Sequence, residues 1–134
     1  MTAKEYLSQA RSIEFKLKIM AEQLQSLKDI AENVTSSLDD MPKAASPNIQ
    51  SMEDAIVRMV DLKDIMRSEL SRLAEINDTI STIPDPFQQA VLVKRYLKYL
   101  RWSDVALELH ISKSHVYRLH NNALIEIEKI LKSR

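Results

Sequence analysis

The first 38 residues carry apolar side chains at steps that alternate between four and three residues. This spacing is a heptad seam, in which one stripe of a long helix faces a partner. Thr2 and Glu5 have capping-box spacing, so we expect a helix over about 3–38. Such a helix cannot bury its stripe alone and needs a partner. The stripe consists of Tyr6, Ala10, Ile13, Leu17, Met20, Leu24, Leu27, Ala31, Val34 and Leu38.

A polar stretch at 39–50 interrupts the pattern, because Pro42 and Pro47 remove backbone donors and disfavour helix before them. The sequence from Ser51 again has capping-box-like spacing, which predicts a second helix over about 52–82. Its apolar stripe is less regular than the first. The stripe consists of Met52, Ile56, Met59, Leu62, Met66, Leu70, Leu73, Ile76, Ile80 and Ile83.

The two long helices are expected to fold back on each other as an antiparallel hairpin across the proline loop. Lys63 and Asn77 fall where a strict seam in the second helix would have apolar groups. A lone two-helix hairpin has a thin core, so a homodimer with a four-helix arrangement is the preferred solution. Residues 1–83 are therefore predicted to be a helical hairpin that serves oligomerisation.

The remaining third of the chain begins with a proline-capped helix. Asp85 is a suitable N-cap, Pro86 suits the first helical position, and Gln88 would complete a capping box. This helix is expected to end near Tyr96 or Leu97, with Phe87, Ala90, Val91, Val93 and Leu97 facing inward.

The stretch that follows has the pattern of a helix-turn-helix, in which a support helix holds a recognition helix against a common core. The support helix is expected over about 102–109, with Val105, Ala106 and Leu109 buried. Trp102 is expected to pack against the preceding helix near Tyr96, because aromatic side chains bury large areas. Residues 84–134 are thus predicted to be a DNA-binding domain, and the fold to be all-α.

The predicted turn is His110, Ile111 and Ser112. Its first residue often needs a left-handed backbone, which a histidine tolerates at some cost. Ile111 would fill the core, and Ser112 is a good N-cap for the recognition helix that starts at Lys113. The inward positions of that helix are expected to be Val116, Leu119, Ala123 and Ile127.

Charge changes this picture, because the overall balance of zero conceals a split along the chain. Residues 1–50 carry a net −1, residues 51–83 a net −3 and residues 84–134 a net +4. The final third is therefore the only part whose field would attract phosphate. The outward face of its recognition helix has side-chain types that suit DNA. The DNA-binding residues are predicted to be Ser112, Lys113, Ser114, His115, Tyr117, Arg118, Asn121 and Asn122, with phosphate contacts from Lys94, Arg95, Lys98 and Arg101.

Composition excludes several kinds of chemistry. The chain has no cysteine and no glycine, so thiolate metal sites, thiol nucleophiles and glycine-lined phosphate loops are excluded. His110, His115 and His120 are five residues apart and do not converge on one helix face, so no metal site is expected. We expect no enzyme activity and no cofactor. Without a long apolar run or a hydrophobic signal core, the chain is expected to be cytoplasmic and free of membrane contact.

The segment 83–131 resembles region four of bacterial sigma factors, in its proline-capped helix, its W-S-D-V-A support helix and its I-S-K-S-H-V-Y-R-L-H-N-N-A-L run. The combination of R-Y-L, a following tryptophan and V-Y-R-L-H with A-L is similar to phage transcriptional regulators of the ArpU and RinA type. The resemblance implies activation of phage late genes through promoter DNA, alongside host RNA polymerase. It places the DNA contacts on Lys113, Ser114, His115, Tyr117 and Arg118.

Two other functions fit the same pattern. One is a DNA-packaging protein similar to small terminases, which also joins a helix-turn-helix to an oligomerising helix. The other is a protein-binding adaptor that acts on host RNA polymerase or another host factor. The predicted partners are thus double-stranded DNA, a second copy through residues 1–83, and RNA polymerase.

Overall fold

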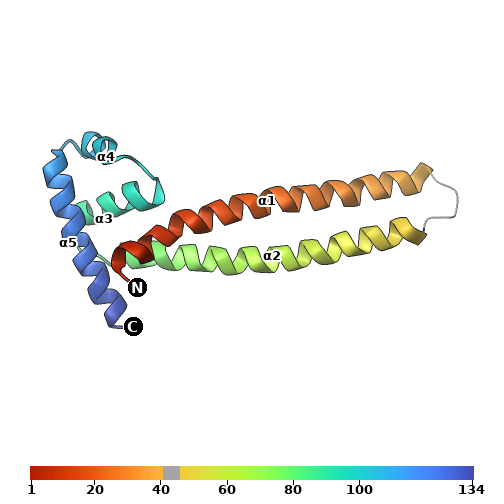
Figure 1. Cartoon of the computed structure of the whole chain (residues 1–134), viewed down its shortest axis with the longest axis horizontal. Helices are drawn as coiled ribbons and strands as arrows, with labels where there is room; N and C mark the ends of the chain where they lie inside the picture. The colour runs from red at the N-terminus through yellow and green to blue at the C-terminus, as the bar shows by residue number, and fades with distance from the viewer. Residues whose placement is uncertain (41–45) are drawn as a thin grey trace. The chain divides into compact units, whose positions relative to one another are not determined.

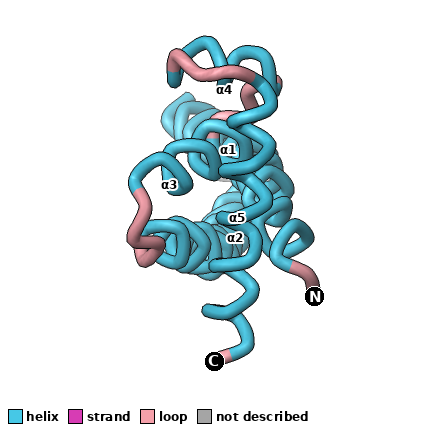
Figure 2. The backbone as a smooth tube through the Cα atoms, turned by 90° about the vertical axis from the view of Figure 1, so that its left-hand side faces the viewer, coloured by secondary structure: helices cyan, strands magenta, loops and turns pink. Residues whose placement is uncertain are grey.

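The computed structural model describes the backbone at residues 1–40 and 46–134, and the side chains at 1–33 and 50–134. Throughout these ranges the chain is helical apart from short connections, which confirms the all-α prediction (Figure 1, Figure 2). The elements are α1 (Ala3–Asp40), α2 (Ser46–Ser81), α3 (Pro86–Leu92), a π-helical turn η1 (Val93–Leu97), α4 (Trp102–Leu109) and α5 (Lys113–Lys132).

Helix α1 begins as its sequence predicts. The backbone N–H of Glu5 donates to Thr2 Oγ1 at 3.2 Å, and the N–H of Thr2 donates to Glu5 Oε2 at 3.4 Å. This reciprocal pair confirms the capping box and satisfies two otherwise unpaired donors. Tyr6, Ala10 and Ile13 are buried, and the following seam positions are half-buried through Ala31. Val34 and Leu38 lie outside the described side chains.

Helix α2 starts earlier than predicted, at Ser46 rather than near residue 52. Pro47 falls in its first turn, where a missing N–H costs no helical hydrogen bond. Asp39 and Asp40 belong to α1, so the predicted loop at 39–50 is shorter at both ends. Residues 41–45, with Pro42, lie outside the described part.

The seam of α2 also differs from the predicted one. Ala55 is buried and Glu69 is half-buried, whereas the neighbouring Ile56 and Leu70 are 47% and 52% exposed. When Ala55 and Glu69 are counted in place of Ile56 and Leu70, the inward positions from Met52 to Ile83 follow one another at steps of three and four residues without a break. Lys63 and Asn77 are exposed, so the prediction that they interrupt the seam is wrong.

The chain divides into two compact units. Unit 1 combines Met1–Glu14 with Arg72–Arg134, and unit 2 is Phe15–Ser71. Within each unit the segments of α1 and α2 run antiparallel beside each other (Figure 1). Unit 1 therefore contains the N-terminal end of α1 and the C-terminal end of α2 in addition to residues 84–134.

Unit 1 has a well-buried core. The largest side chains that are exposed by less than 2% come from both stretches of the unit. They are Leu7, Ile13, Ile76, Thr79, Ile80, Ile83, Val91, Leu92, Val105, Val116 and Ile127.

A polar cluster inside unit 1 joins three distant stretches of sequence. Tyr6 Oη and Thr79 Oγ1 are 3.0 Å apart, and Thr79 is fully buried. Arg134 donates from Nη2 to Thr79 Oγ1 at 2.6 Å and from Nη1 to Glu75 Oε1 at 3.0 Å. These contacts attach the segment after α5 to both long helices.

Unit 2 has almost no core of its own. Among its described side chains, at 15–33 and 50–71, Ala55 alone is buried. The seam residues that face each other across the two helices are only half-buried. Large apolar side chains are exposed on both helices: Phe15, Ile19, Ile30, Ile56, Val57, Val60, Ile65 and Leu70.

The predicted cap at the start of α3 is half formed. Asp85 Oδ1 accepts from the N–H groups of Phe87 and Gln88 at 2.8 and 3.4 Å, and Pro86 is the first helical residue. The prediction that Gln88 completes the box is wrong, because its Oε1 is buried with no hydrogen-bond partner in the described structure. Instead Gln89 Nε2 donates to the carbonyl of Ile83, which fixes the entry to α3.

Candidate nucleic-acid interface

The α4–α5 connection has the geometry expected of a helix-turn-helix. His110 ends α4 in the left-handed region, with φ 58° and ψ 41°, as predicted. The N–H of Ile111 donates to the carbonyl of Ala106 at 3.1 Å. Ser112 Oγ accepts from the N–H of His115 at 3.1 Å and caps α5. The turn therefore fixes the direction in which α5 leaves α4.

One face of α5 is held in the core of unit 1. Val116, Leu119, Ala123 and Ile127 are buried, as the sequence predicts. Val116 and Leu119 pack with residues of α3 and α4, and the half-buried side chains Leu100, Trp102, Leu109 and Ile111 close this cluster.

The opposite face of α5 is open to solvent over its first three turns. Lys113, Ser114, His115, Tyr117, Arg118, Asn121 and Asn122 are all exposed. Tyr117 is 42% exposed, and its ring lies edge-on to Trp102 at 5.4 Å. The structure thus brings the predicted recognition residues together on one surface of one capped helix. Ser112 lies at the start of that surface.

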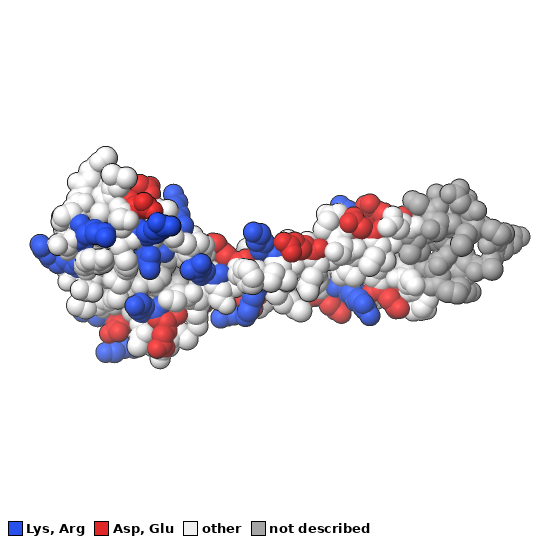
Figure 3. All heavy atoms as spheres, turned by 45° about the horizontal axis from the view of Figure 1, so that its top comes forward, with Lys and Arg blue, Asp and Glu red and all other residues white. Residues whose placement is uncertain are grey.

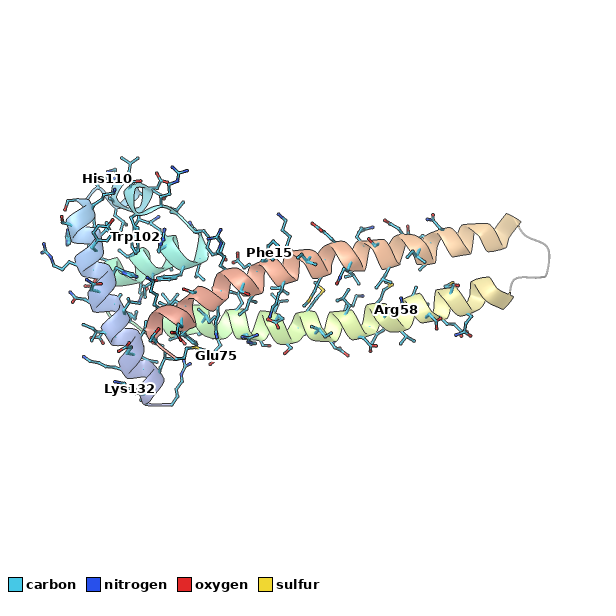
Figure 4. The ribbon with its side chains drawn as sticks, in the orientation of Figure 1. Phe15, Arg58, Glu75, Trp102, His110 and Lys132 are labelled. Atoms are coloured by element: carbon cyan, nitrogen blue, oxygen red, sulfur yellow. The ribbon has the colours of Figure 1, made fainter. Side chains whose placement is uncertain are left out.

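A buried aromatic cluster lies behind this surface, and the sequence pattern did not predict that His120 belongs to it. His120 Nε2 is 2.7 Å from Tyr96 Oη, and the two rings stack at 5.7 Å. The ring of Trp102, which Figure 4 labels, meets His120 edge-on at 4.6 Å. His120 follows Val116 by four residues and precedes Ala123 by three. Helical spacing therefore places His120 on the same inward face of α5.

His120 is uncharged in this environment. Burial, reinforced by the positive charges of Lys4 and Arg95, lowers its pKa from 6.5 to about 4. Burial also raises the pKa of Tyr96, with Arg95 opposing the shift. At neutral pH the 2.7 Å bond therefore joins a neutral phenol to a neutral imidazole.

The four predicted phosphate contacts divide into two pairs. Lys98 and Arg101 are exposed. Lys94 instead forms a salt bridge with Glu108 of α4 at 3.0 Å, with 20% of its side chain exposed. Arg95 donates from Nη1 to the carbonyl of Leu100 at 2.9 Å and lies 4.5 Å over the Trp102 ring. Lys94 and Arg95 thus hold α4 against the preceding helix.

The backbone between α3 and α4 is irregular. After the π-helical turn η1, Tyr99 adopts φ 59°, in the left-handed region that disfavours a side chain with a Cβ. The N–H of Lys98 donates to the carbonyl of Val93, and the N–H of Leu100 donates to that of Lys94, both at 3.0 Å. This connection lets Arg95, Tyr99 and Trp102 approach one another.

Charge follows the division into units. Unit 1 contains 12 basic and 9 acidic side chains, whereas unit 2 contains 7 and 10. The first unit therefore has a net +3 and the second a net −3. Lys and Arg side chains gather on the face of unit 1 that Figure 3 displays. A positive unit favours approach to a polyanion such as DNA.

Neither a metal site nor a membrane-spanning helix is found in residues 1–40 and 46–134. These residues contain no group of three or more His, Cys, Asp or Glu side chains that could hold a metal ion. None of the helices described is both long enough and apolar enough to cross a membrane.

No protein-family model, curated protein or solved structure matches the chain. The features that bear on its function are therefore the exposed face of α5, the turn that positions this helix and the positive charge of unit 1.

Proposed function

We propose that the protein binds specific sequences of double-stranded DNA through α5 and regulates transcription. The single observation that carries the proposal is the exposed face from Lys113 to Asn122. It combines basic, amide, hydroxyl and aromatic side chains on a helix that is N-capped and anchored along its other face.

The chemistry of this face matches the edges of base pairs. Lys113 and Arg118 can donate to the O6 and N7 of guanine, and Asn121 can bond adenine in a bidentate manner. The capped N-terminus of α5 favours a nearby phosphate, and Lys98 and Arg101 can neutralise flanking phosphates. The exposed face of α5 would thus read the DNA sequence, and the surrounding cations would fix the position of the helix along the duplex.

We further propose that a second copy of the chain covers unit 2 and gives a homodimer. Unit 2 buries only Ala55 among its described side chains, while Phe15, Ile56 and Val60 are 63%, 47% and 54% exposed. Two hairpins that pack together would bury such side chains in a four-helix core. Two recognition helices would then read half-sites about one DNA helical turn, or a multiple, apart.

The DNA proposal is tested by selecting duplexes from a random library with the full-length protein and measuring their affinity by fluorescence anisotropy. We expect Arg118→Ala to weaken binding of the selected duplex by roughly 1–3 kcal/mol. Lys132→Ala is the matched control, because Lys132 is an exposed cation in the last turn of the same helix. We expect that control to keep wild-type affinity at fixed salt.

Salt provides an independent check on the same complex. Affinity should fall steeply between 50 and 200 mM salt, because each neutralised phosphate releases bound counterions. Failure to enrich any duplex, or equal losses in Arg118→Ala and Lys132→Ala, would refute base recognition by α5.

Oligomeric state separates transcriptional regulation from packaging. Light scattering coupled to gel filtration should give a dimer, and Val60→Glu should convert it to a monomer. Ser68→Glu, at an exposed polar position of the same helix, should leave the dimer intact. A ring of eight or more copies would instead favour a small-terminase-like packaging protein.

The resemblance to sigma region four adds host RNA polymerase as a proposed partner. Co-purification with polymerase that survives nuclease treatment would support it. Co-purification without any DNA affinity would favour the adaptor function over DNA binding.

A further inference from the structure

Unit 1 contains a cavity of about 300 Å³ between the start of α1 and the connection from η1 to α4. A cavity of this size lies at the lower end of the range for small-molecule sites. Its walls contain three cationic side chains, three aromatic rings and a serine hydroxyl, with no carboxylate. The lining residues are Lys4, Ser8, Arg11, Arg95, Tyr96, Tyr99 and Trp102.

The three cations come from separate stretches of chain. Lys4 and Arg11 lie on the exposed side of α1, and neither forms a salt bridge in the described structure. The guanidinium of Arg11 lies 5.5 Å from the centre of the Tyr99 ring. Arg95 lies over Trp102 on the other side and is fixed by its bond to the carbonyl of Leu100. Like charges that line one cavity repel one another unless an anion sits between them.

The positive potential reaches a neighbouring buried group. The charges of Lys4 and Arg95 both contribute to the lowered pKa of His120, after the larger effect of burial. The same field that disfavours a proton on His120 favours a negative charge in the cavity.

Tyr99 supplies an unusual donor at this site. Its hydroxyl is buried without a hydrogen-bond partner in the described structure, and its backbone is left-handed. The left-handed conformation is disfavoured for a non-glycine residue, and it places this side chain in the wall. Burial, followed by the Glu14 carboxylate that interacts with this hydroxyl, raises the pKa of Tyr99, and the charge of Arg11 opposes the shift, so the hydroxyl keeps its proton.

We propose that this cavity binds a small multivalent anion of the organic-phosphate or polycarboxylate class. Lys4, Arg11 and Arg95 supply the charge, and Ser8 and Tyr99 supply hydroxyl donors. The ligand would join the start of α1 to the connection that leads into α4, and so stabilise unit 1 by binding only its folded form.

The cavity also touches the proposed DNA-binding surface through one side chain. Trp102 forms part of the wall and meets Tyr117 of the recognition face edge-on at 5.4 Å. An anion that shifts Trp102 would therefore shift Tyr117 and change DNA affinity. This coupling rests on the proposed function, whereas binding of the anion does not.

Trp102 provides the readout, because it is the single tryptophan of the chain and lines the cavity. The full-length protein, without DNA, is titrated with inorganic phosphate, glycerol 3-phosphate and citrate, each against sodium chloride of equal ionic strength. We expect a saturable change in tryptophan emission with at least one of them. A preference for citrate identifies the polycarboxylate class, and a preference for glycerol 3-phosphate identifies organic phosphate.

Lys4→Met and Arg11→Gln should each weaken the response about tenfold, as expected for loss of one charge-assisted contact. Lys16→Gln, an exposed cation further along α1, should leave it unchanged. Circular dichroism verifies that each variant is folded. A response that does not saturate, that sodium chloride reproduces, or that survives both cavity variants would overturn the proposal.

The coupling is tested separately by repeating the DNA titration with and without the anion that binds. We expect at least a threefold change in affinity for the selected duplex. An unchanged affinity would refute the coupling through Trp102 and leave the anion site standing. Absence of DNA binding would refute the proposed function without affecting the emission titration.

Discussion

Acidification should destabilise unit 1 through His120. The side chain is 7% exposed, bonded to Tyr96 and subject to the positive charges of Lys4 and Arg95, and its pKa is lowered to about 4. In the unfolded chain the imidazole returns to its ordinary pKa of 6.5. Between these two values the unfolded state binds a proton that the native state does not bind. Stability is therefore present above pH 6.5 and is lost as the pH falls toward 4.

The expected loss follows directly from this difference. Each pH unit between the two pKa values removes about 1.4 kcal/mol of unfolding free energy. Lowering the pH from 7.5 to 5.0 should thus cost about 2 kcal/mol from His120 alone. That is a large part of the 5–15 kcal/mol by which a typical domain is stable.

Urea unfolding followed by circular dichroism at pH 7.5, 6.5, 5.5 and 5.0 measures the loss. His120→Gln removes the titrating group and keeps an amide that can bond Tyr96, so its pH dependence should be flatter by about 2 kcal/mol. His115→Gln is the control, because His115 is exposed on the same helix. Equal pH dependence in wild type and His120→Gln would refute the reasoning, as would a native-state NMR titration of His120 with a pKa near 6.5.

Three further predictions concern unit 1. Ile127→Ala should cost about 2–5 kcal/mol in urea unfolding, because Ile127 is fully buried, whereas Ile125→Ala, at a 53% exposed position, should change stability by less than about 0.5 kcal/mol. His110→Gly should raise the free energy of unfolding by up to about 1 kcal/mol, since glycine relieves the left-handed backbone at the turn; a loss would contradict that geometry. Arg134→Gln should cost about 1–2 kcal/mol by removing a charged donor from buried Thr79, and a neutral result would show that this contact is not formed in solution.

The features that depend on neighbouring residues could be predicted from the sequence. The Thr2–Glu5 box, the Asp85 cap and the left-handed turn at His110 each follow from a few side chains and the backbone beside them. The buried positions of α5 follow from helical periodicity. The same periodicity also places His120 on the inward face, but it was not predicted there because a polar residue was not assigned to the core.

The features that depend on distant partners could not be predicted. In α2 the larger apolar side chains Ile56 and Leu70 were predicted to lie in the seam. In the structure they are exposed, and the adjacent Ala55 and Glu69 take the inward positions. A heptad pattern specifies spacing but leaves a shift by one residue open when apolar side chains border the seam. The cavity beside Arg95 could likewise not be predicted, because three of its seven lining residues come from the distant start of α1.

The discontinuous make-up of unit 1 has a consequence for the order of folding. Docking of Met1–Glu14 onto Arg72–Arg134, which completes the unit that holds α5, closes the whole of Phe15–Ser71 into a loop. Loop-closure entropy rises with loop length, by about 0.6 kcal/mol for each doubling. If the hairpin of α1 and α2 forms first, it brings Met1–Glu14 and Arg72–Arg134 together and removes much of that entropic barrier. Changes in the hairpin should therefore slow maturation of the α5 surface without touching it.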